Sequence, residues 1–266
     1  MASLTLKKTL AVFALSVIAV LSCDKENNPD DDQMVIAPDG TVDMGLLLTR
    51  EDGSLYRLFW AECNLGASLP EEIGDYYAWG EVYSDKPSYD TDSYKWCNGT
   101  KRVKTGNNSY ELYLMLTRYC PKDRTEHWGG YGDPDGKTEF SDYGYADDAA
   151  RANLGGKWRT PTEQEWLTLR RNAITMYVTY NGVSCMKITS KITGNSIYLP
   201  ATGVRKDTFH EHKLDWCYMT ATVTADYPTT AQTMIKNHGG TLTDGIGRNS
   251  RWIGMNVRPV WEEPVP

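Results

Sequence analysis

The sequence predicts an α+β fold in which short helices accompany small antiparallel sheets and long loops. Three observations support this class. A capped helix start lies near the middle of the chain, alternating apolar and polar runs flank turn sequences on both sides of it, and residues 99–146 are rich in Gly, Asp, Tyr and Asn. With 266 residues, 40% of them hydrophobic and 24% charged, the composition is that of a globular protein.

Residues 1–22 are expected to be a signal peptide rather than part of the fold. Lys7 and Lys8 form a positive region, and the apolar run Leu10–Leu21 is shorter than the ~20 residues of a membrane span. The run ends with a small residue before Cys23, which resembles a bacterial lipobox, so Cys23 is the expected lipidation site. A plain secretory signal followed by a coincidental cysteine is the alternative.

Residues 23–40 are expected to be an acidic tether between the lipid and the domain. They are polar and rich in Asp, and such a run cannot bury enough apolar surface to order itself. Acidic residues directly after the cysteine resemble the surface-export signal of Bacteroidetes lipoproteins. This resemblance implies a protein anchored in the outer membrane and facing the exterior, in contact with the membrane through its lipid only.

The domain opens with a predicted β-hairpin. Thr41–Leu48 alternates loosely, Glu51–Ser54 is a turn sequence, and Leu55–Cys63 alternates apolar with other residues. Residues 99–146 are expected to form long loops with one short helical piece near residues 110–119.

The best-defined predicted element is a helix over about residues 162–173. Thr160 and Thr162 can each serve as its N-cap, because each is followed three residues later by a glutamate that completes a capping box. The apolar face of this helix comprises Trp166, Leu169 and Ala173.

An antiparallel meander is predicted after the helix. Met176–Tyr180 and Val183–Ser190 flank Asn181-Gly182, a dipeptide that favours a type I′ turn, and Ser196–Leu199 follows a second turn. Residues 214–253 show no clear pattern. The last strand, Met255–Val260, is expected to close back on the first.

Eight ordered segments match the motifs of a known family. They are Trp60–Ala67, Pro70–Glu81, Tyr94–Gly99, Leu116–Cys120, Asp147–Ala150, Trp158–Trp166, Gly194–Gly203 and Gly254–Val260. The chain thereby resembles the Fibrobacter succinogenes major paralogous domain family, whose architecture is similar to that of C-type lectins and formylglycine-generating enzymes. The resemblance implies a C-type-lectin-like domain over residues 41–261 with paired terminal strands, followed by a tail at 262–266.

Two positions depart from the family pattern. Thr160 stands where Leu or Met is usual, and Trp216–Met219 stands where relatives have Tyr-Trp-Ser-Ser. The second departure falls where relatives resemble one another, so a site there is expected to be altered.

The resemblance implies a binding or adhesion protein that uses loops 76–145 and 204–252. The chain has 17 Tyr and 9 Trp against 4 Phe, and aromatic faces stack on sugars, so glycan is the expected ligand and a surface protein the alternative. The candidate ligand contacts are Trp79, Tyr94, Trp96, Trp128, Tyr131, Trp216 and Trp252. Nucleic acid is excluded as a partner, because the net charge is −7 and the chain has no basic stripe.

An enzyme of the formylglycine-generating type is one alternative, and a structural subunit of a surface assembly is another. Those enzymes bind copper with a cysteine pair near the C-terminus, where this chain has Cys217 alone. Ergothioneine-type relatives need three histidines at an iron site, and His210-Glu211-His212 offers two without a recognisable third. We therefore predict no catalytic residues and no bound transition metal.

Calcium is a further candidate cofactor, since many C-type lectins use it. Asp133–Gly136 and Asp142–Asp148 supply carboxylates, but not at the spacing of a known calcium loop. We therefore expect a solvated acidic loop and no cofactor.

Five cysteines follow Cys23. Cys97 and Cys120 bracket a loop-rich segment and form a candidate disulfide, which would add ~3 kcal/mol in the chain-entropy model. Cys63 and Cys185 lie in apolar strands and are expected to be buried thiols.

The remaining motif residues are expected to be structural. They are Trp158, Arg159, Pro161, Thr162, Glu165, Trp166 and Arg258. Arg159 and Arg258 are each expected to form a buried ion pair, with Asp75, Glu81 or Glu165 as the candidate partners.

Overall fold

The computed structural model describes residues 37–84, 86–104, 106–120, 130–132, 135–211, 214–224, 227–236 and 245–265. For residues 111, 112, 130–132 and 236 it describes the backbone only. The expected signal peptide 1–22, Cys23 and most of the tether 23–40 therefore lie outside the described residues. None of the helices within these ranges has both the length and the apolar character needed to cross a membrane.

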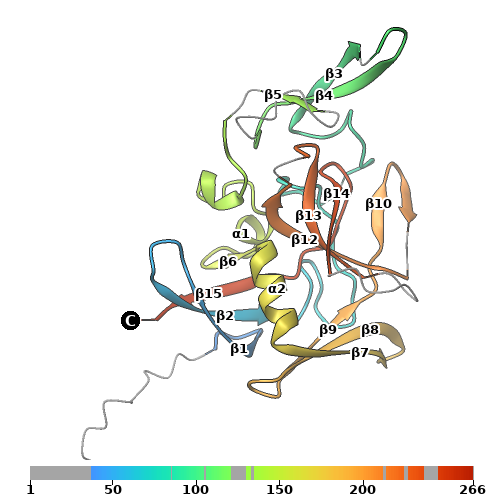
Figure 1. Cartoon of the computed structure of the whole chain (residues 1–266). Coiled ribbons are helices and arrows are strands. Elements are labelled where there is room, and N and C mark those ends of the chain that lie inside the picture. The colour runs from blue at the N-terminus through green and yellow to red at the C-terminus, as the bar shows by residue number, and fades with distance from the viewer. Residues whose placement is uncertain are drawn as a thin grey trace, which may run out of the picture. The chain divides into compact units, whose positions relative to one another are not determined.

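The described residues form small, mainly antiparallel sheets with few helices (Figure 1). The first sheet has the order β1-β2-β15-β6. Its strands are β1 (Thr41–Thr49), β2 (Leu55–Ala61), β15 (Val260–Pro264) and β6 (Trp158–Arg159). The predicted opening hairpin is confirmed, and both ends of the domain enter this one sheet.

The last strand differs from its prediction. It begins at Val260 and pairs with β2, with Val260 opposite Trp60, so β2 separates it from β1. Residues 262–264, expected to be a tail, belong to the strand. The strand does not begin at Met255, as predicted, because Met255 and Asn256 form isolated bridges to Tyr77 and Tyr218 instead.

The predicted helix is confirmed as α2 (Glu163–Arg171). Thr162 is its N-cap: the Glu165 N–H donates to Thr162 Oγ1 over 3.2 Å, and the Thr162 N–H donates to Glu165 Oε2 over 2.8 Å. Thr160 is not a cap of this helix, because its N–H and hydroxyl both donate to Asp148, the N-cap of α1 (Ala149–Leu154).

The predicted meander is also confirmed. It consists of β7 (Ala173–Tyr180), β8 (Val183–Ser190) and β9 (Ser196–Pro200), in the order β7-β8-β9. Asn181 and Gly182 have φ of 47° and 83°, as a type I′ turn requires.

The remaining elements either differ from the sequence prediction or lie in segments for which the sequence predicted no element. They are β3 (Cys97–Lys104), β4 (Tyr110–Leu116), β5 (Gly130–Gly132), the 3₁₀ helix η1 (Phe140–Tyr143), β10 (Val204–Lys206), β11 (Phe209–Glu211), β12 (Trp216–Val223), β13 (Thr230–Lys236) and β14 (Ile246–Ser250). The helical piece expected near residues 110–119 is strand β4, which pairs with β3. Strand β12 was not predicted because nearly all its side chains are buried. Its sequence therefore lacks the alternation of apolar and polar residues that is typical of a half-exposed strand.

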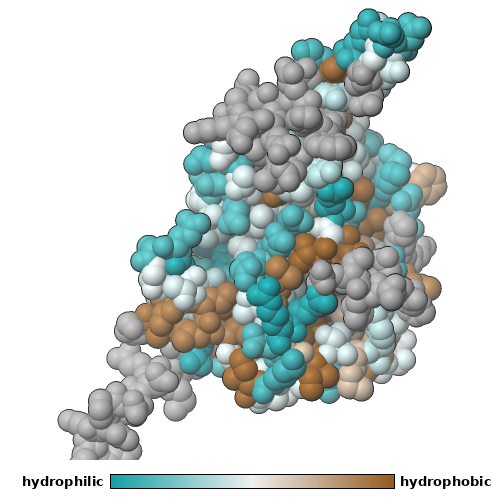
Figure 2. Space-filling model, viewed as in Figure 1, coloured by the Kyte–Doolittle hydropathy of each residue, from teal (hydrophilic) through white to brown (hydrophobic). Residues whose placement is uncertain are grey.

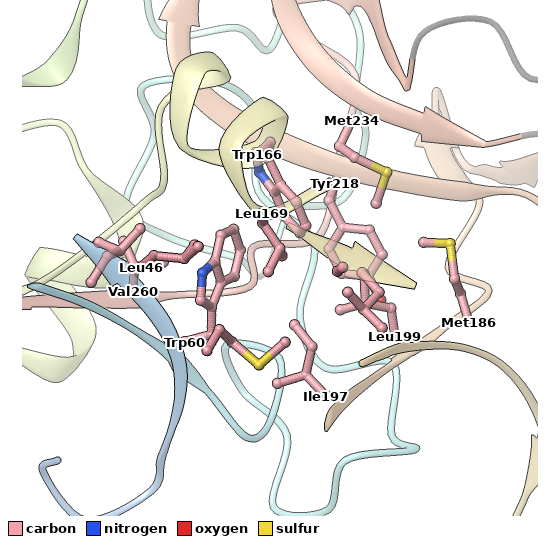
Figure 3. Close-up of a cluster of buried hydrophobic side chains, with 14 of the residues drawn as sticks. Leu46, Trp60, Trp166, Leu169, Met186, Ile197, Leu199, Tyr218, Met234 and Val260 are labelled. Carbon is pink, nitrogen blue, oxygen red and sulfur yellow. The ribbon is translucent and has the colours of Figure 1, made fainter. Parts of the chain in front are cut away.

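One hydrophobic cluster joins α2 to the first sheet and the meander. Figure 3 shows Trp60 of β2 and Trp166 of α2 facing each other, with Leu199 of β9 and Tyr218 of β12 beside them. The two indole rings lie 4.4 Å apart between centroids. A second cluster, around Trp79 and Phe140, supports the loops that follow β2.

Candidate functional site

Three of the predicted ligand contacts are core residues. Trp79 and Trp216 are fully buried and Tyr94 is 2% exposed. Their polar atoms are used internally: Trp79 Nε1 donates to Thr220 O over 2.9 Å, and Trp216 Nε1 donates to Leu199 O over 2.7 Å. The prediction that these side chains contact a ligand is therefore wrong, because no ligand can reach them without unfolding the core.

Trp96 and Trp252 do not form an open surface either. Trp96 and Trp252 are half-buried against a third cluster that contains Tyr94. Trp96 Nε1 donates to Gly80 O over 2.8 Å, and the Lys95 ammonium lies 4.2 Å from the Trp96 ring centroid. Trp128 lies outside the described residues, and for Tyr131 only the backbone is described.

Arg159 forms the ion pair expected of it. Its guanidinium binds Glu165 through two bonds of 2.7 and 2.5 Å and Glu262 through its Nε at 2.9 Å. Burial disfavours the charged form of Arg159, but the carboxylates of Glu165 and Glu262 outweigh it and hold its pKa above its ordinary value. Tyr56 donates its hydroxyl to Glu165 over 2.8 Å, so the helix start and the first sheet share one polar network.

Arg258 does not form the expected ion pair. Among the described residues it meets no carboxylate: its Nε donates to Asn64 Oδ1 over 2.8 Å, and its terminal nitrogens donate to the carbonyls of Ala61, Glu62 and Tyr198. Burial lowers the pKa of Arg258. Its role is structural, because it binds the end of β2, the loop after β2 and the middle of β9 together.

The candidate disulfide is not formed. The Cys97 thiol donates to Gly99 O over 3.2 Å, and Cys120 Sγ lies 3.8 Å from the carbonyl oxygens of Leu116 and Arg118. Cys120 belongs to the third cluster and Cys97 packs against it. Cys185 is buried as expected, whereas Cys63 is half-buried.

The acidic segment is not a solvated loop where it is described. Asp135 accepts the N–H groups of Tyr119 and Cys120, each over 2.8 Å, and Asp147 binds Arg118 Nε over 2.8 Å. Within the described ranges no group of three His, Cys, Asp or Glu side chains could hold a metal ion. Asp133 and His212 lie outside those ranges, and His210 Nε2 lies 2.9 Å from the Tyr76 hydroxyl.

The best candidate site is a polar cleft of about 500 Å³ between two segments far apart in sequence. We call it the 76/205 cleft. It is lined by Gly74, Asp75, Tyr76, Ser84, Lys86, Pro87, Tyr89, Arg205, Asp207 and Thr208. Apart from Gly74 and Asp75, its lining residues belong to the two loop regions, 76–145 and 204–252, that the sequence assigns to recognition.

Backbone pairing holds the two walls of the cleft together. Tyr89 and Asp207 exchange N–H···O bonds of 2.9 and 3.0 Å, and Arg205 and Gly254 exchange two of 2.8 Å. Gly254 is required there, because a Cβ would come within 2.7 Å of the Tyr89 ring. The Tyr89 hydroxyl lies 2.6 Å from both Tyr76 O and Ser84 O and donates its one hydrogen to this pair of carbonyls. The cleft is thus rigid on the side that carries its aromatic rings.

The charges of the cleft are partly neutralised from within. Lys86 binds Glu81 over 2.8 Å, so this cation is already paired. Arg205 is exposed, lies 5.6 Å from the Tyr76 ring centroid, and forms no ion pair with any described residue. Burial raises the pKa of both Tyr76 and Tyr89, so both phenols are neutral at physiological pH. The cleft therefore offers a guanidinium, two carboxylates and the half-buried ring of Tyr76 to a polar ligand, whereas the buried Tyr89 ring only supports the wall.

Sequence reasoning missed the residues of this cleft. Tyr76 lies in the motif segment Pro70–Glu81 but was not predicted to contact a ligand. Arg205 lies in a segment that matches no motif. The two residues are separated by more than a hundred positions, and they meet through the bridges at Tyr89 and Gly254 and through the bond of the Tyr76 hydroxyl to Thr202 O. No linear spacing in the sequence reports such a contact.

No family model matches the chain, and no curated protein or solved structure is similar to it.

Proposed function

We propose that this chain is a lipid-anchored cell-surface protein that binds a glycan in the 76/205 cleft. The observation that carries the proposal is the composition of the cleft: the half-buried Tyr76 ring lies near Arg205, which forms no ion pair with a described residue, and the carboxylates of Asp75 and Asp207 line the same cleft. Saccharide hydroxyls need both donors and acceptors, and the apolar faces of sugar rings pack on aromatic side chains. A cleft of this kind suits one or two sugar units better than an extended apolar ligand.

The fold proposal is a C-type-lectin-like domain anchored through Cys23 to the outer face of the outer membrane. Two observations support the domain type: strands from both ends of the domain share the first sheet, and long loops rather than regular elements form the cleft. The anchor and its location rest on the lipobox-like sequence before Cys23 and the acidic residues after it.

A glycan array probed with the full chain tests this function. We expect binding to a limited set of saccharides, and loss of that binding in the Arg205→Ala and Asp207→Asn variants. Asn is the suitable replacement for Asp207, which has φ of 50°, because Asn tolerates the left-handed region. An array without any signal above background, or signals that survive both substitutions, would refute glycan binding in the cleft and favour the protein-ligand alternative.

The formylglycine-generating type of enzyme has less support. Its chemistry needs a reactive thiolate, and the cysteine nearest the C-terminus is Cys217. Burial raises the pKa of Cys217 to about 12, so it stays protonated at neutral pH. Copper uptake that disappears in Cys217→Ala would reverse this preference.

A further inference from the structure

A groove runs along one face of α2 and shares no lining residue with the 76/205 cleft. We call it the α2 groove, and its volume is about 800 Å³. The helix contributes Glu163, Leu167, Arg170 and Arg171, whose spacing places them on one side of α2. Strands β13 and β14 also contribute lining residues. The helix rises ~12 Å between Glu163 and Arg171, and this rise sets the length of the groove.

One end of the α2 groove is positively charged. Arg170, Arg171 and Lys191 line it, and all three side chains are exposed. Lys191 Nζ donates to Arg171 O over 3.0 Å and so satisfies a carbonyl at the helix end. Cations at this end also favour the helix dipole, but neither guanidinium has an ion pair or a hydrogen bond within the described ranges. Three cations without a carboxylate partner, in a chain of net charge −7, suit an anionic ligand.

An apolar pocket of about 50 Å³ lies beside this charged end. The pocket and the α2 groove share Leu167, Arg170 and Ile246. Figure 3 shows four further side chains of the pocket, which belong to the first hydrophobic cluster: Trp166, Leu169, Met186 and Met234. In Figure 2, hydrophobic surface adjoins the hydrophilic strip that covers α2. A water molecule needs ~10–15 Å³ of such volume, so the pocket admits an aliphatic group of about four carbon atoms.

The chain at Gly245 supports the Arg170 side chain. A Cβ at Gly245 would lie 3.1 Å from both Cδ and Nη1 of Arg170. The arginine therefore packs against the backbone just before β14, at the boundary between the charged end of the groove and the apolar pocket. A cation held in this way loses less freedom when it binds a ligand.

The closeness of charge and pocket restricts the kind of anion that fits. Because Arg170 lines both, the acidic group and the aliphatic group of the ligand must lie close together. In an extended peptide, neighbouring side chains point to opposite faces, so an acidic residue next to an aliphatic one presents only one of the two groups. A C-terminal residue carries its carboxylate and its side chain on one Cα. An inorganic anion would leave the pocket unfilled.

We propose that the α2 groove binds the C-terminal end of a polypeptide whose last residue is Leu or Ile. The terminal carboxylate meets the guanidinium groups of Arg170 and Arg171, and the last side chain fills the apolar pocket. Charge-assisted bonds between arginine and a carboxylate give both affinity and orientation. Capture of a C-terminal carboxylate is one of the recurring modes of peptide recognition.

The rest of the groove suits the residues that precede this terminus. A length of ~12 Å accommodates three to four extended residues at ~3.3 Å each. Glu163 and Gln232 line the groove beyond the cations and provide acceptors and a donor for peptide N–H and C=O groups. A free aliphatic acid would use the pocket and the arginines but none of this length, so the groove favours a peptide.

Fluorescence anisotropy with the full chain tests the carboxylate. The probe is a pool of fluorescein-labelled tetrapeptides with three randomised positions before a C-terminal Leu. The free acid should bind about tenfold or more tightly than the C-terminal amide, as expected for loss of hydrogen bonds to a charged group. Arg170→Gln and Arg171→Gln should each weaken the acid to a similar extent. Arg102→Gln is the matched control, since Arg102 is also exposed but lies on β3, and it should bind like the wild type.

The last side chain and the length of the ligand are tested by changing the peptide alone. A pool ending in Ala should bind about tenfold or more weakly than the pool ending in Leu, because three carbon atoms leave the pocket. Unlabelled 4-methylpentanoate, which matches the terminal Leu without the chain, should displace the peptide only at much higher concentration. Equal binding of acid and amide, wild-type affinity in both arginine variants, or displacement by 4-methylpentanoate at the peptide's own dissociation constant would overturn the proposal.

Discussion

The most informative perturbation of the fold is Glu165→Gln. Glu165 is 1% exposed, completes the capping box of α2, and holds the buried guanidinium of Arg159 through two bonds. Removing one partner of a buried ion pair typically costs about 3–5 kcal/mol, because the other charge stays buried without compensation. Glu262 still lies 2.8 Å from Arg159, so we expect a loss near the lower limit, about 3 kcal/mol.

Urea unfolding measures this loss at neutral pH. The urea concentration at the unfolding midpoint should fall, while the slope of the unfolding free energy against urea concentration stays the same, since the variant exposes the same surface on unfolding. Arg57→Gln is the control: its pair with Asp43 is 3.4 Å long and partly exposed, so its loss should stay within about 1 kcal/mol. A Glu165→Gln variant as stable as Arg57→Gln would refute the assigned importance of the network.

Three further outcomes are expected. Burial favours the protonated form of Glu262, but Arg159 outweighs it and lowers the pKa of Glu262 below its ordinary value of 4.5. The ion pair therefore stabilises the folded state fully above pH 4.5, and this stabilisation is lost as the pH falls through the lower pKa of the folded state. The free energy of unfolding of Glu262→Gln should therefore fall less steeply with decreasing pH than that of the wild type. Gly182→Ala should cost about 1–2 kcal/mol in urea unfolding, because φ is +83° and nothing lies within 4 Å of the added Cβ. Trp79→Ala should cost about 3–5 kcal/mol as a core deletion, and a variant that lost glycan binding without losing stability would contradict its burial.

Local chemistry explains which elements could be predicted. The capping box at Thr162, the turn at Asn181-Gly182 and the first hairpin each depend on residues within a few positions of one another. Their signals are therefore complete in the sequence, and the structure contains all three. The ion pair between Arg159 and Glu165 belongs to the same class, because six positions separate its partners.

Burial and distant pairing explain what the sequence did not reveal. Strand β12 is buried on both faces, so its pattern resembles no half-exposed strand. Trp79 and Trp216 carry the chemistry of a sugar platform, but only the three-dimensional packing shows that they are core residues. The segment of Arg205 meets that of Tyr76 through an isolated bridge between Tyr89 and Asp207 and through the bond of the Tyr76 hydroxyl to Thr202 O, and such contacts leave no periodicity in the sequence.

Titration of Arg205→Ala most directly tests the central claim, that recognition occurs in the 76/205 cleft. With a saccharide selected on the array, the variant should bind about tenfold or more weakly, as expected for loss of a hydrogen bond to a charged group. Arg102→Ala is the matched control, because Arg102 is also exposed and lies 4.2 Å from the Tyr110 ring centroid on β4. Its affinity should equal that of the wild type. Equal affinities for wild type and Arg205→Ala would contradict the claim.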